Sequence, residues 1–311
     1  MFEYQIQKAW KSYKKDFGLG RIALFVCFHN AFMFLTTMLF LGGAQSLYLL
    51  SISCSLIFYF LRDKIVEKGN LTIFIMNAVL LSLTVGIGYY VPGRIDEAVG
   101  GFDRMDQIFV NFDNWLWGSP ISLILENFLR SLGSFGTFLY DLFMVNYVCY
   151  FLLPFYAGII YYRQLSRDHK YKLGRMFASY ILFFLTNFLL YMIVPVTGPQ
   201  YFLRDIYTTA LPFSEFGQYF YNSIQQSQPT FIDCFPSGHF GISLLSTAWL
   251  FRLDQKPHKY IMVFLMLNIM FATLANRYHY TLDLLASIPL CIFAYKGGRL
   301  LFPTGIEKKG H

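Results

Sequence analysis

Long apolar runs separated by short charged segments make up most of the chain. Ile22–Leu41 and Leu71–Val91, for example, contain no charged residue and only one histidine between them. A run of about 18 or more such residues is long enough to cross the hydrocarbon core of a bilayer as a helix. A soluble protein with many buried helices does not fit runs so free of charge. The pattern therefore predicts an all-α fold, a polytopic membrane helical bundle.

Eight apolar runs are predicted to be spans, and the last three of them are short, with 14 to 16 residues each. The predicted spans are Ile22–Leu41, Leu47–Leu61, Leu71–Val91, Thr137–Tyr162, Met176–Val194, Gly238–Phe251, Tyr260–Ala275 and Thr281–Tyr295. Two long segments, Pro92–Phe135 and Val196–Phe235, lie between spans. We expect Pro92–Phe135 to form short helices at the membrane interface, because it contains apolar stretches together with Trp115 and Trp117.

The N-terminal segment Met1–Gly20 has a different pattern. Four lysines accompany apolar side chains that recur along one helical stripe. This arrangement is typical of a helix that lies on the membrane surface. The full-length apolar run that follows argues against a secretory signal.

Composition and charge support a membrane protein and predict its orientation. Hydrophobic residues make up 56% of the chain and charged residues 14%, against about 25% charged in soluble domains. The net charge of +7 does not indicate nucleic-acid binding, because the basic residues cluster in short segments between spans. An eight-span path places Arg62–Asn70, Arg163–Arg175, Arg252–Lys259 and the basic tail on one face, as the positive-inside rule expects. We therefore predict cytoplasmic N- and C-termini, with both long segments on the periplasmic or lumenal side.

The first candidate motif, Asp233-Cys-Phe-Pro-Ser-Gly-His-Phe240, stands where the second long segment meets a span. Proline disfavours helix in the residue before it and suits the start of a helix, so the span should begin near Ser237. Free N–H groups at a helix start form a phosphate site, to which Gly238 gives close access and Ser237 adds a hydroxyl. His239 would lie in the first turn and could protonate a departing oxygen. A helix cap with an interfacial histidine is the alternative.

The second candidate motif is Asn276-Arg-Tyr-His-Tyr-Thr-Leu-Asp283. On a helix, its spacing would put His279 and Asp283 on one face. An unpaired carboxylate inside a span costs roughly 2.5–3.5 kcal/mol, so Asp283 needs a partner. A carboxylate bonded to one ring nitrogen leaves the other nitrogen free as a base or nucleophile. A structural His–Asp pair is the alternative, but a second histidine, His239, on the same side of the membrane favours chemistry on a phosphate.

These motifs resemble the second and third signatures of the type 2 phosphatidic acid phosphatase superfamily, whose third signature ends in His-x-x-x-Asp. Within it, Phe-Pro-Ser-Gly-His followed by Arg-Tyr-His-Tyr-Thr-Leu-Asp is similar to the inositol phosphorylceramide synthase and sphingomyelin synthase-like branch. Further similarity lies in Asp113, Leu116, Gly118 and Pro120, in Tyr147 to Pro154, and in Pro195-x-x-Gly-Pro199. The resemblance covers residues 70–296.

The resemblance implies a six-helix catalytic core within the bundle of about eight transmembrane helices. The expected parts are an interfacial segment (1–20), two additional transmembrane helices (21–70), the catalytic core (71–296) and a basic cytoplasmic tail (297–311). The catalytic site would face the non-cytoplasmic side. The five cysteines are scattered, with no Cys-x-x-Cys pair, and we expect no metal and no cofactor.

By position, the resemblance also implies a role for each motif residue. His279 would be the nucleophile that forms a phosphohistidine, and Asp283 would orient it. His239 would be the general acid for the leaving alkoxide and then the base for the acceptor. The superfamily's first signature, Lys-x6-Arg-Pro, is absent from the sequence. Positive charge must neutralise the phosphoryl oxygens, so we expect Arg277, and after it Arg204, to supply it.

Three functions fit these observations. The first is an integral membrane lipid phosphotransferase that moves a phosphoryl headgroup, such as phosphoinositol from phosphatidylinositol, to a ceramide-like acceptor and releases diacylglycerol. The second is a lipid phosphatase that uses the same residues with water as acceptor. The third is a proton-coupled transporter or channel, since intramembrane His and Asp also relay protons. The expected partners are membrane lipids, and the sequence indicates no oligomeric state.

Overall fold

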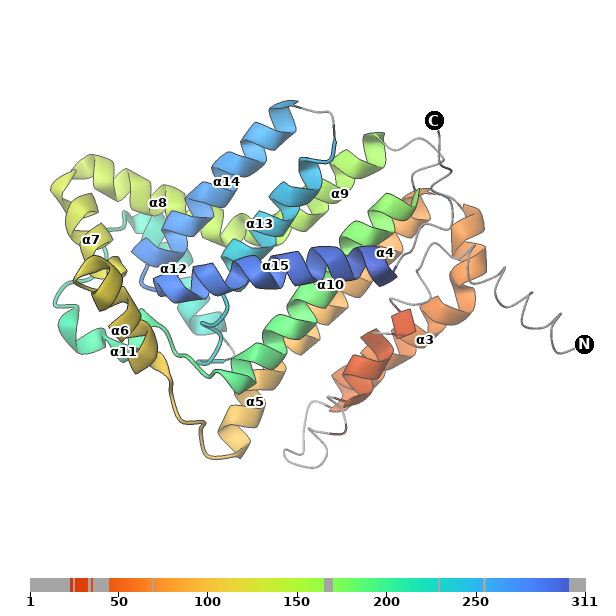
Figure 1. Cartoon of the computed structure of the whole chain (residues 1–311), viewed down its shortest axis with the longest axis horizontal. Helices are drawn as coiled ribbons and strands as arrows, with labels where there is room; N and C mark the ends of the chain where they lie inside the picture. The colour runs from red at the N-terminus through yellow and green to blue at the C-terminus, as the bar shows by residue number, and fades with distance from the viewer. Residues whose placement is uncertain are drawn as a thin grey trace, which may run out of the picture. The chain divides into compact units, whose positions relative to one another are not determined.

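The computed structural model describes residues 23–24, 26–32, 35, 45–68, 70–164, 170–228, 230–253 and 256–301. Regular structure in these ranges is helical, apart from an isolated parallel bridge between Val196 and Asp233 (Figure 1). This confirms the all-α fold. The predicted interfacial segment Met1–Gly20 and most of the first predicted span lie outside the described residues.

The chain divides into two compact units. One comprises residues 1–88, 155–185 and 293–311, and the other comprises residues 89–154 and 186–292. Three helices contribute to both units: α9 (Leu153–Gln164), α10 (Lys170–Ile193) and α15 (Thr281–Leu301). Both candidate motifs belong to the second unit.

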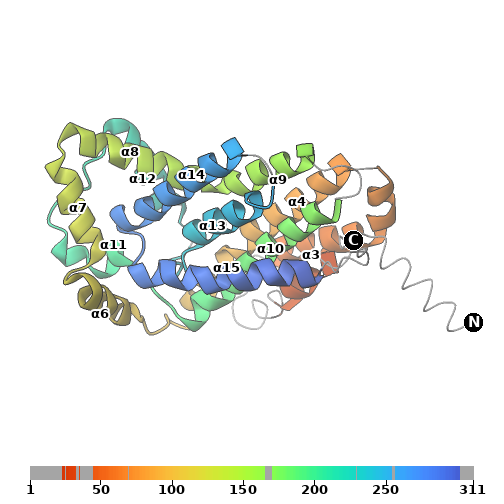
Figure 2. The ribbon, with the colours of Figure 1, turned by 45° about the horizontal axis from the view of Figure 1, so that its top comes forward.

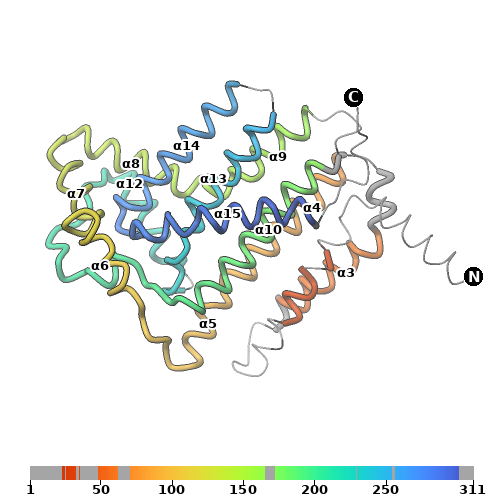
Figure 3. The backbone as a smooth tube through the Cα atoms, in the orientation of Figure 1, coloured from red at the N-terminus to blue at the C-terminus, as the bar shows by residue number. Residues whose placement is uncertain are grey.

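In the first unit, α3 (Gln45–Lys68) packs against α4 (Asn70–Gly88) (Figure 3). Buried Asn30 donates a hydrogen bond to Ser51 on α3, at 2.8 Å. The charged segment that we predicted as a connection between spans instead continues α3 as far as Lys68. Lysine, arginine and glutamate are good helix formers, so the helix need not end where its apolar run ends.

The second unit consists of shorter helices. They are α5 (Tyr90–Ala98), α6 (Asp106–Trp117), α7 (Ile121–Ser131), α8 (Ser134–Cys149), α11 (Pro199–Phe202), α12 (Glu215–Ser227), α13 (Gly238–Leu250) and α14 (Lys256–Ala275), with 3₁₀ turns η1 (Tyr150–Leu152) and η3 (Arg204–Ile206). Helix α14 packs against α7, α8 and α13, and α13 lies between α14 and α15 (Figure 2). The segment predicted as the first long connection holds α5, α6 and α7, which confirms its short helices.

Four stretches of the described residues are long and apolar enough to cross a membrane: Leu71–Ala98, Ser134–Gln164, Lys172–Ile193 and Lys256–Ala275. An integral membrane protein agrees with this finding, whereas the eight-span path and its orientation stay predictions. The fourth predicted span corresponds to α8 and α9, which are joined by the 3₁₀ turn η1. The second long segment between spans, Val196–Phe235, contains α11, η3 and α12.

A buried carboxylate fixes two helix starts at once. Asp113 on α6 accepts the backbone N–H of Ile121 at 3.2 Å and that of Thr281 at 3.1 Å. These residues are the first of α7 and of α15, where N–H groups have no partner within the helix. Asp113 therefore ties the start of the helix that carries Asp283 to the start of α7.

Candidate active site

Backbone hydrogen bonds bring the two motifs together. Ser237 caps α13, its Oγ accepting the N–H of Phe240 at 3.4 Å. The N–H of Ser237 donates to the carbonyl of Asp283 at 3.2 Å, and Ser287 Oγ donates to the carbonyl of Ser237 at 2.9 Å. The predicted helix start at Pro-Ser-Gly-His is thus found where expected, and it is joined to the first turns of α15.

Two tyrosines hold the imidazole of His239 between them. The ring of Tyr147 stacks on it with centroids 3.8 Å apart and planes at 14°, and that of Tyr150 lies 3.8 Å away at 41°. Tyr147 also stacks on Tyr278, at 4.6 Å. These contacts come from α8, η1 and the second motif, and they restrict rotation of the His239 ring.

The two motif histidines face each other. The ring centroids of His239 and His279 lie 6.3 Å apart, with planes at 58°. Hydrogen bonds to a phosphate oxygen span about 2.7–3.2 Å, so both rings are close enough to contact one phosphoryl group placed between them. Sequence spacing alone could not predict this distance, because the motifs are far apart along the chain.

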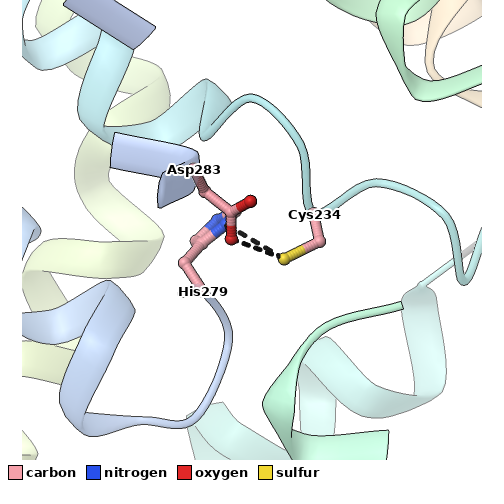
Figure 4. A group of neighbouring side chains, drawn as sticks. All are labelled: Cys234, His279 and Asp283. Carbon is pink, nitrogen blue, oxygen red and sulfur yellow. Dashed lines mark hydrogen bonds and ion pairs between the residues drawn. The ribbon is translucent and has the colours of Figure 1, made fainter. Parts of the chain in front are cut away.

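Three neighbours lie around one oxygen of Asp283. Its Oδ2 lies 2.8 Å from the sulfur of Cys234 and 3.4 Å from Nδ1 of His279 (Figure 4). The same oxygen accepts the N–H of Tyr280 at 2.7 Å. The sequence spacing would put His279 and Asp283 on one face of a helix. Helix α15 starts only at Thr281, so His279 precedes the helix and the two residues do not share a helical face. The two side chains meet across the start of the helix instead.

Cys234, His279 and Asp283 form a group of possible metal donors, with their ligand atoms within 4.8 Å of one another. Zinc binds cysteine as the thiolate. Burial and the charge of Asp283 both raise the pKa of the Cys234 thiol well above its ordinary value, which favours the protonated form that donates to Asp283. The expectation of a site without metal stays a prediction.

The two arginines predicted to bind phosphate lie in different surroundings. Arg277 donates to Oε2 of Glu126 from Nε at 3.0 Å and from Nη2 at 2.5 Å. Its guanidinium also covers the ring of Tyr207 at 3.9 Å. The side chain of Arg204 is 79% exposed, and its Nε lies 3.6 Å from Oδ1 of Asp205. Of the predicted site residues, the structure brings together His239, His279, Asp283, Ser237 and Gly238, whereas Arg277 is bound to Glu126 and Arg204 lies at the surface.

A comparison with protein families decides the classification. A family model described as the PAP2 superfamily matches residues 109–296, more than half of the chain. The chain belongs to the PAP2 superfamily. This membership agrees with the phosphatase- or phosphotransferase-type function expected from the motifs, and the sphingolipid synthase-like branch remains a prediction.

A relative of this PAP2-superfamily protein is a PA-phosphatase related-family protein of Dictyostelium discoideum. The two are 21% identical over 263 residues, which cover 73% of this chain and 47% of the relative. The chain therefore spans about half the length of the curated relative that it matches. No solved structure matches the chain.

Sequence reasoning about the PAP2 site missed Asp233, although it is the first residue of the first motif. Its carboxylate accepts hydrogen bonds from the hydroxyl of Tyr89 and from Gln228 Nε2, the latter at 3.1 Å. Burial raises the pKa of Asp233 above its ordinary value, which the Tyr89 hydrogen bond and the nearby His279 partly offset. Asp233 therefore adds a carboxyl group to the surroundings of His279.

Sequence reasoning also missed Asp106, which fixes the loop behind the site. Its carboxylate accepts the N–H groups of Thr197 and Gly198, each at 2.9 Å, and the hydroxyl of Tyr280 at 3.0 Å. Gly198 has φ of +96°, and a Cβ there would lie 2.7 Å from the carbonyl of Tyr278. Glycine at position 198 thus lets this loop approach the segment that carries His279. The motif Pro195-x-x-Gly-Pro199 was the sequence signal that could have indicated the importance of this loop.

Proposed function

We propose that the protein is a lipid phosphotransferase that forms a phosphohistidine on His279. Nε2 of His279 attacks phosphorus of a phospholipid donor, and the bond from phosphorus to the diacylglycerol oxygen breaks. His239 gives its proton to that oxygen, so diacylglycerol leaves as an alcohol. The pair of facing imidazoles, 6.3 Å apart, carries this proposal.

The second half reaction returns both histidines to their starting state. His239, now unprotonated, accepts the proton of an acceptor hydroxyl, whose oxygen attacks phosphorus as the P–N bond to His279 breaks. Asp283 stabilises the positive charge that develops on the His279 ring. With phosphatidylinositol as donor and a ceramide-like lipid as acceptor, the products are diacylglycerol and inositol phosphorylceramide, the pair that the sequence resemblance implies.

The charges near the site support a phosphodiester donor. A phosphodiester carries one negative charge, whereas a phosphomonoester carries about −1.5 to −2 at neutral pH. Asp233 directly precedes Cys234, whose sulfur lies 3.5 Å from Nδ1 of His279, and the guanidinium of Arg277 is bound by the buried carboxylate of Glu126. A site with these charges repels a dianion more strongly than a monoanion.

A lipid phosphatase is the second candidate, and the family match and the printed name of the Dictyostelium relative support it. In that reaction, water takes the place of the acceptor hydroxyl and the same two histidines act. Which acceptor reacts depends on whether the site admits water or a lipid alcohol. Family membership favours either enzyme over the transporter or channel that the sequence left open.

The test uses the full chain in lipid vesicles with phosphatidylinositol labelled at phosphorus. Phosphotransfer predicts a labelled ceramide product when ceramide is present, and little free inositol phosphate without it. The phosphatase predicts free inositol phosphate with or without ceramide. Absence of covalent label on the protein after quenching in base would contradict both.

His279→Ala is the informative variant, and we expect it to lose the covalent label. The matched control is His258→Ala. His258 belongs to the first turn of α14, whereas His279 follows the end of that helix, so the control variant should be labelled like the unaltered protein.

A further inference from the structure

The start of α13 offers N–H groups that the helix itself does not use. The N–H of Ser237 donates to the carbonyl of Asp283, and the hydroxyl oxygen of Ser237 accepts the N–H of Phe240. The next two residues, Gly238 and His239, open the helix, where backbone N–H groups have no partner within the helix. The positive end of the helix dipole lies at the same place.

A fully buried amide lies beside this helix start. Asn187 on α10 is 0% exposed, and its amide makes no well-formed hydrogen bond among the residues that the structure describes, although the hydroxyl of Tyr191 lies beside it. A buried amide without a partner costs free energy, so such groups usually have a reason to be there, for example a ligand.

Gly238 shows where this amide lies. A Cβ built on Gly238 would be 3.4 Å from Nδ2 of Asn187 and 3.3 Å from the hydroxyl oxygen of Tyr191. Both groups therefore reach the helix start on the side where a side chain at Gly238 would stand. A larger residue at this position would press on both groups, and they would have to shift by a few tenths of an ångström.

We propose that Asn187 and Tyr191, with the first N–H groups of α13, form a binding site for a nonbridging oxygen of the transferred phosphoryl group. This inference rests on the proposed function and names the donors that bind phosphate within it. The site would lie next to His239, which follows Gly238 directly. It would also help to stabilise the charge of the phosphoryl oxygens, since the superfamily's Lys-x6-Arg-Pro signature is absent from this sequence.

The chemistry of these donors matches the substrate class. An amide, a phenol and backbone N–H groups are neutral, and together with a helix dipole they stabilise a single negative charge. The guanidinium of Arg277 is already bound to Glu126, so neutral donors explain how a phosphodiester could be held without that guanidinium. The ligand predicted at Asn187 is therefore a monoanionic phosphodiester oxygen.

The test compares phosphoenzyme formation in the full chain and in Asn187→Leu, with labelled phosphatidylinositol in vesicles. Removing one donor to a developing oxyanion lowers the rate of the chemical step by about 100- to 1000-fold, so we expect that loss in kcat with KM nearly unchanged. Leucine has a similar volume and no unpaired polar group. The thermal midpoint of Asn187→Leu should therefore stay level or rise. The kcat of Tyr191→Phe should be about tenfold lower than that of the unaltered protein.

Asn77→Leu is the matched control. Asn77 is buried on α4 and donates to the carbonyl of Ile73, so this variant should keep the rate of the unaltered protein and lose some stability. Equal rates in Asn187→Leu and the unaltered protein would overturn the inference, and so would a lower thermal midpoint without a slower chemical step. If the unaltered protein itself forms no phosphoenzyme, the proposed function fails, and that outcome is distinct from a failure of Asn187 alone.

Discussion

The sulfur of Cys234 lies 2.8 Å from Oδ2 of Asp283, closer than the 3.4 Å that separates the same oxygen from Nδ1 of His279. The thiol and the imidazole thus share one carboxylate oxygen. The thiol therefore helps to hold the carboxylate that orients the imidazole of His279, although it need not touch the substrate.

Cys234→Ala should slow phosphoenzyme formation. The thiol donates to Oδ2 of Asp283, so its loss leaves the carboxylate less firmly held beside Nδ1 of His279. We expect the rate to fall by about tenfold, which corresponds to the loss of one hydrogen bond. Cys234→Ser keeps a hydroxyl donor and should stay close to the unaltered rate. Equal losses in both variants would indicate a packing role only.

Tyr147→Leu should impair the step in which His239 acts as an acid. The stacked ring of Tyr147 fixes the His239 imidazole, so its loss should lower turnover of a natural phospholipid by about tenfold, within the range of general acid catalysis. A p-nitrophenyl ester needs little acid assistance because its leaving group is already stable. The defect should therefore shrink with that substrate, whereas a general loss of folding would affect both substrates equally. Tyr147→Phe keeps the ring and is the control.

Asp233→Asn should change which phosphate esters are accepted. Removing a negative charge near His279 should raise turnover of phosphatidic acid relative to phosphatidylinositol by about tenfold. Because burial raises the pKa of Asp233, its carboxyl group takes up a proton at a higher pH than an exposed aspartate. In the unaltered protein, relative turnover of phosphatidic acid should therefore rise as the pH falls, and this dependence should be weaker in the variant. Asp205→Asn, at a residue 95% exposed, should leave the ratio unchanged.

Glu126→Gln should destabilise the fold. Glu126 is 4% exposed and binds both Arg277 and Arg130, so the substitution leaves a mostly buried guanidinium without its counter-charge. We expect the free energy of unfolding to fall by roughly 3–5 kcal/mol. The control is the exposed pair Arg94–Glu97. Glu97→Gln should change the free energy of unfolding by less than about 1 kcal/mol. A similar effect of both variants would contradict a role for burial.

The sequence predicted those features that depend on neighbouring residues. Long apolar runs predicted the helices, and proline followed by serine and glycine predicted the capped start of α13. The spacing of His279 and Asp283 correctly indicated a pair, although the helix begins between them. In each case the cause is local, because it lies in the conformational preferences of a few consecutive residues.

Contacts between distant residues could not be predicted in this way. Glu126 and Arg277 are 151 positions apart, and no pattern within either segment indicates that they meet. Tyr147 resembles any other aromatic residue of an apolar run until His239 stacks on it. Asp106 and Asp113 lie in a segment whose helices are too short to show a clear period, so their roles at helix starts and loops depended on the fold.

Asp113 has a mechanical consequence. One carboxylate oxygen of Asp113 accepts the N–H of the first residue of α7, and the other accepts the N–H of the first residue of α15, so this side chain links the two helix starts. Trp117 strengthens the link, because its Nε1 donates to Oγ1 of Thr281 at 2.9 Å. Neither helix start can slide without the other, so the first turn of α15, which carries Asp283, keeps its position relative to α7.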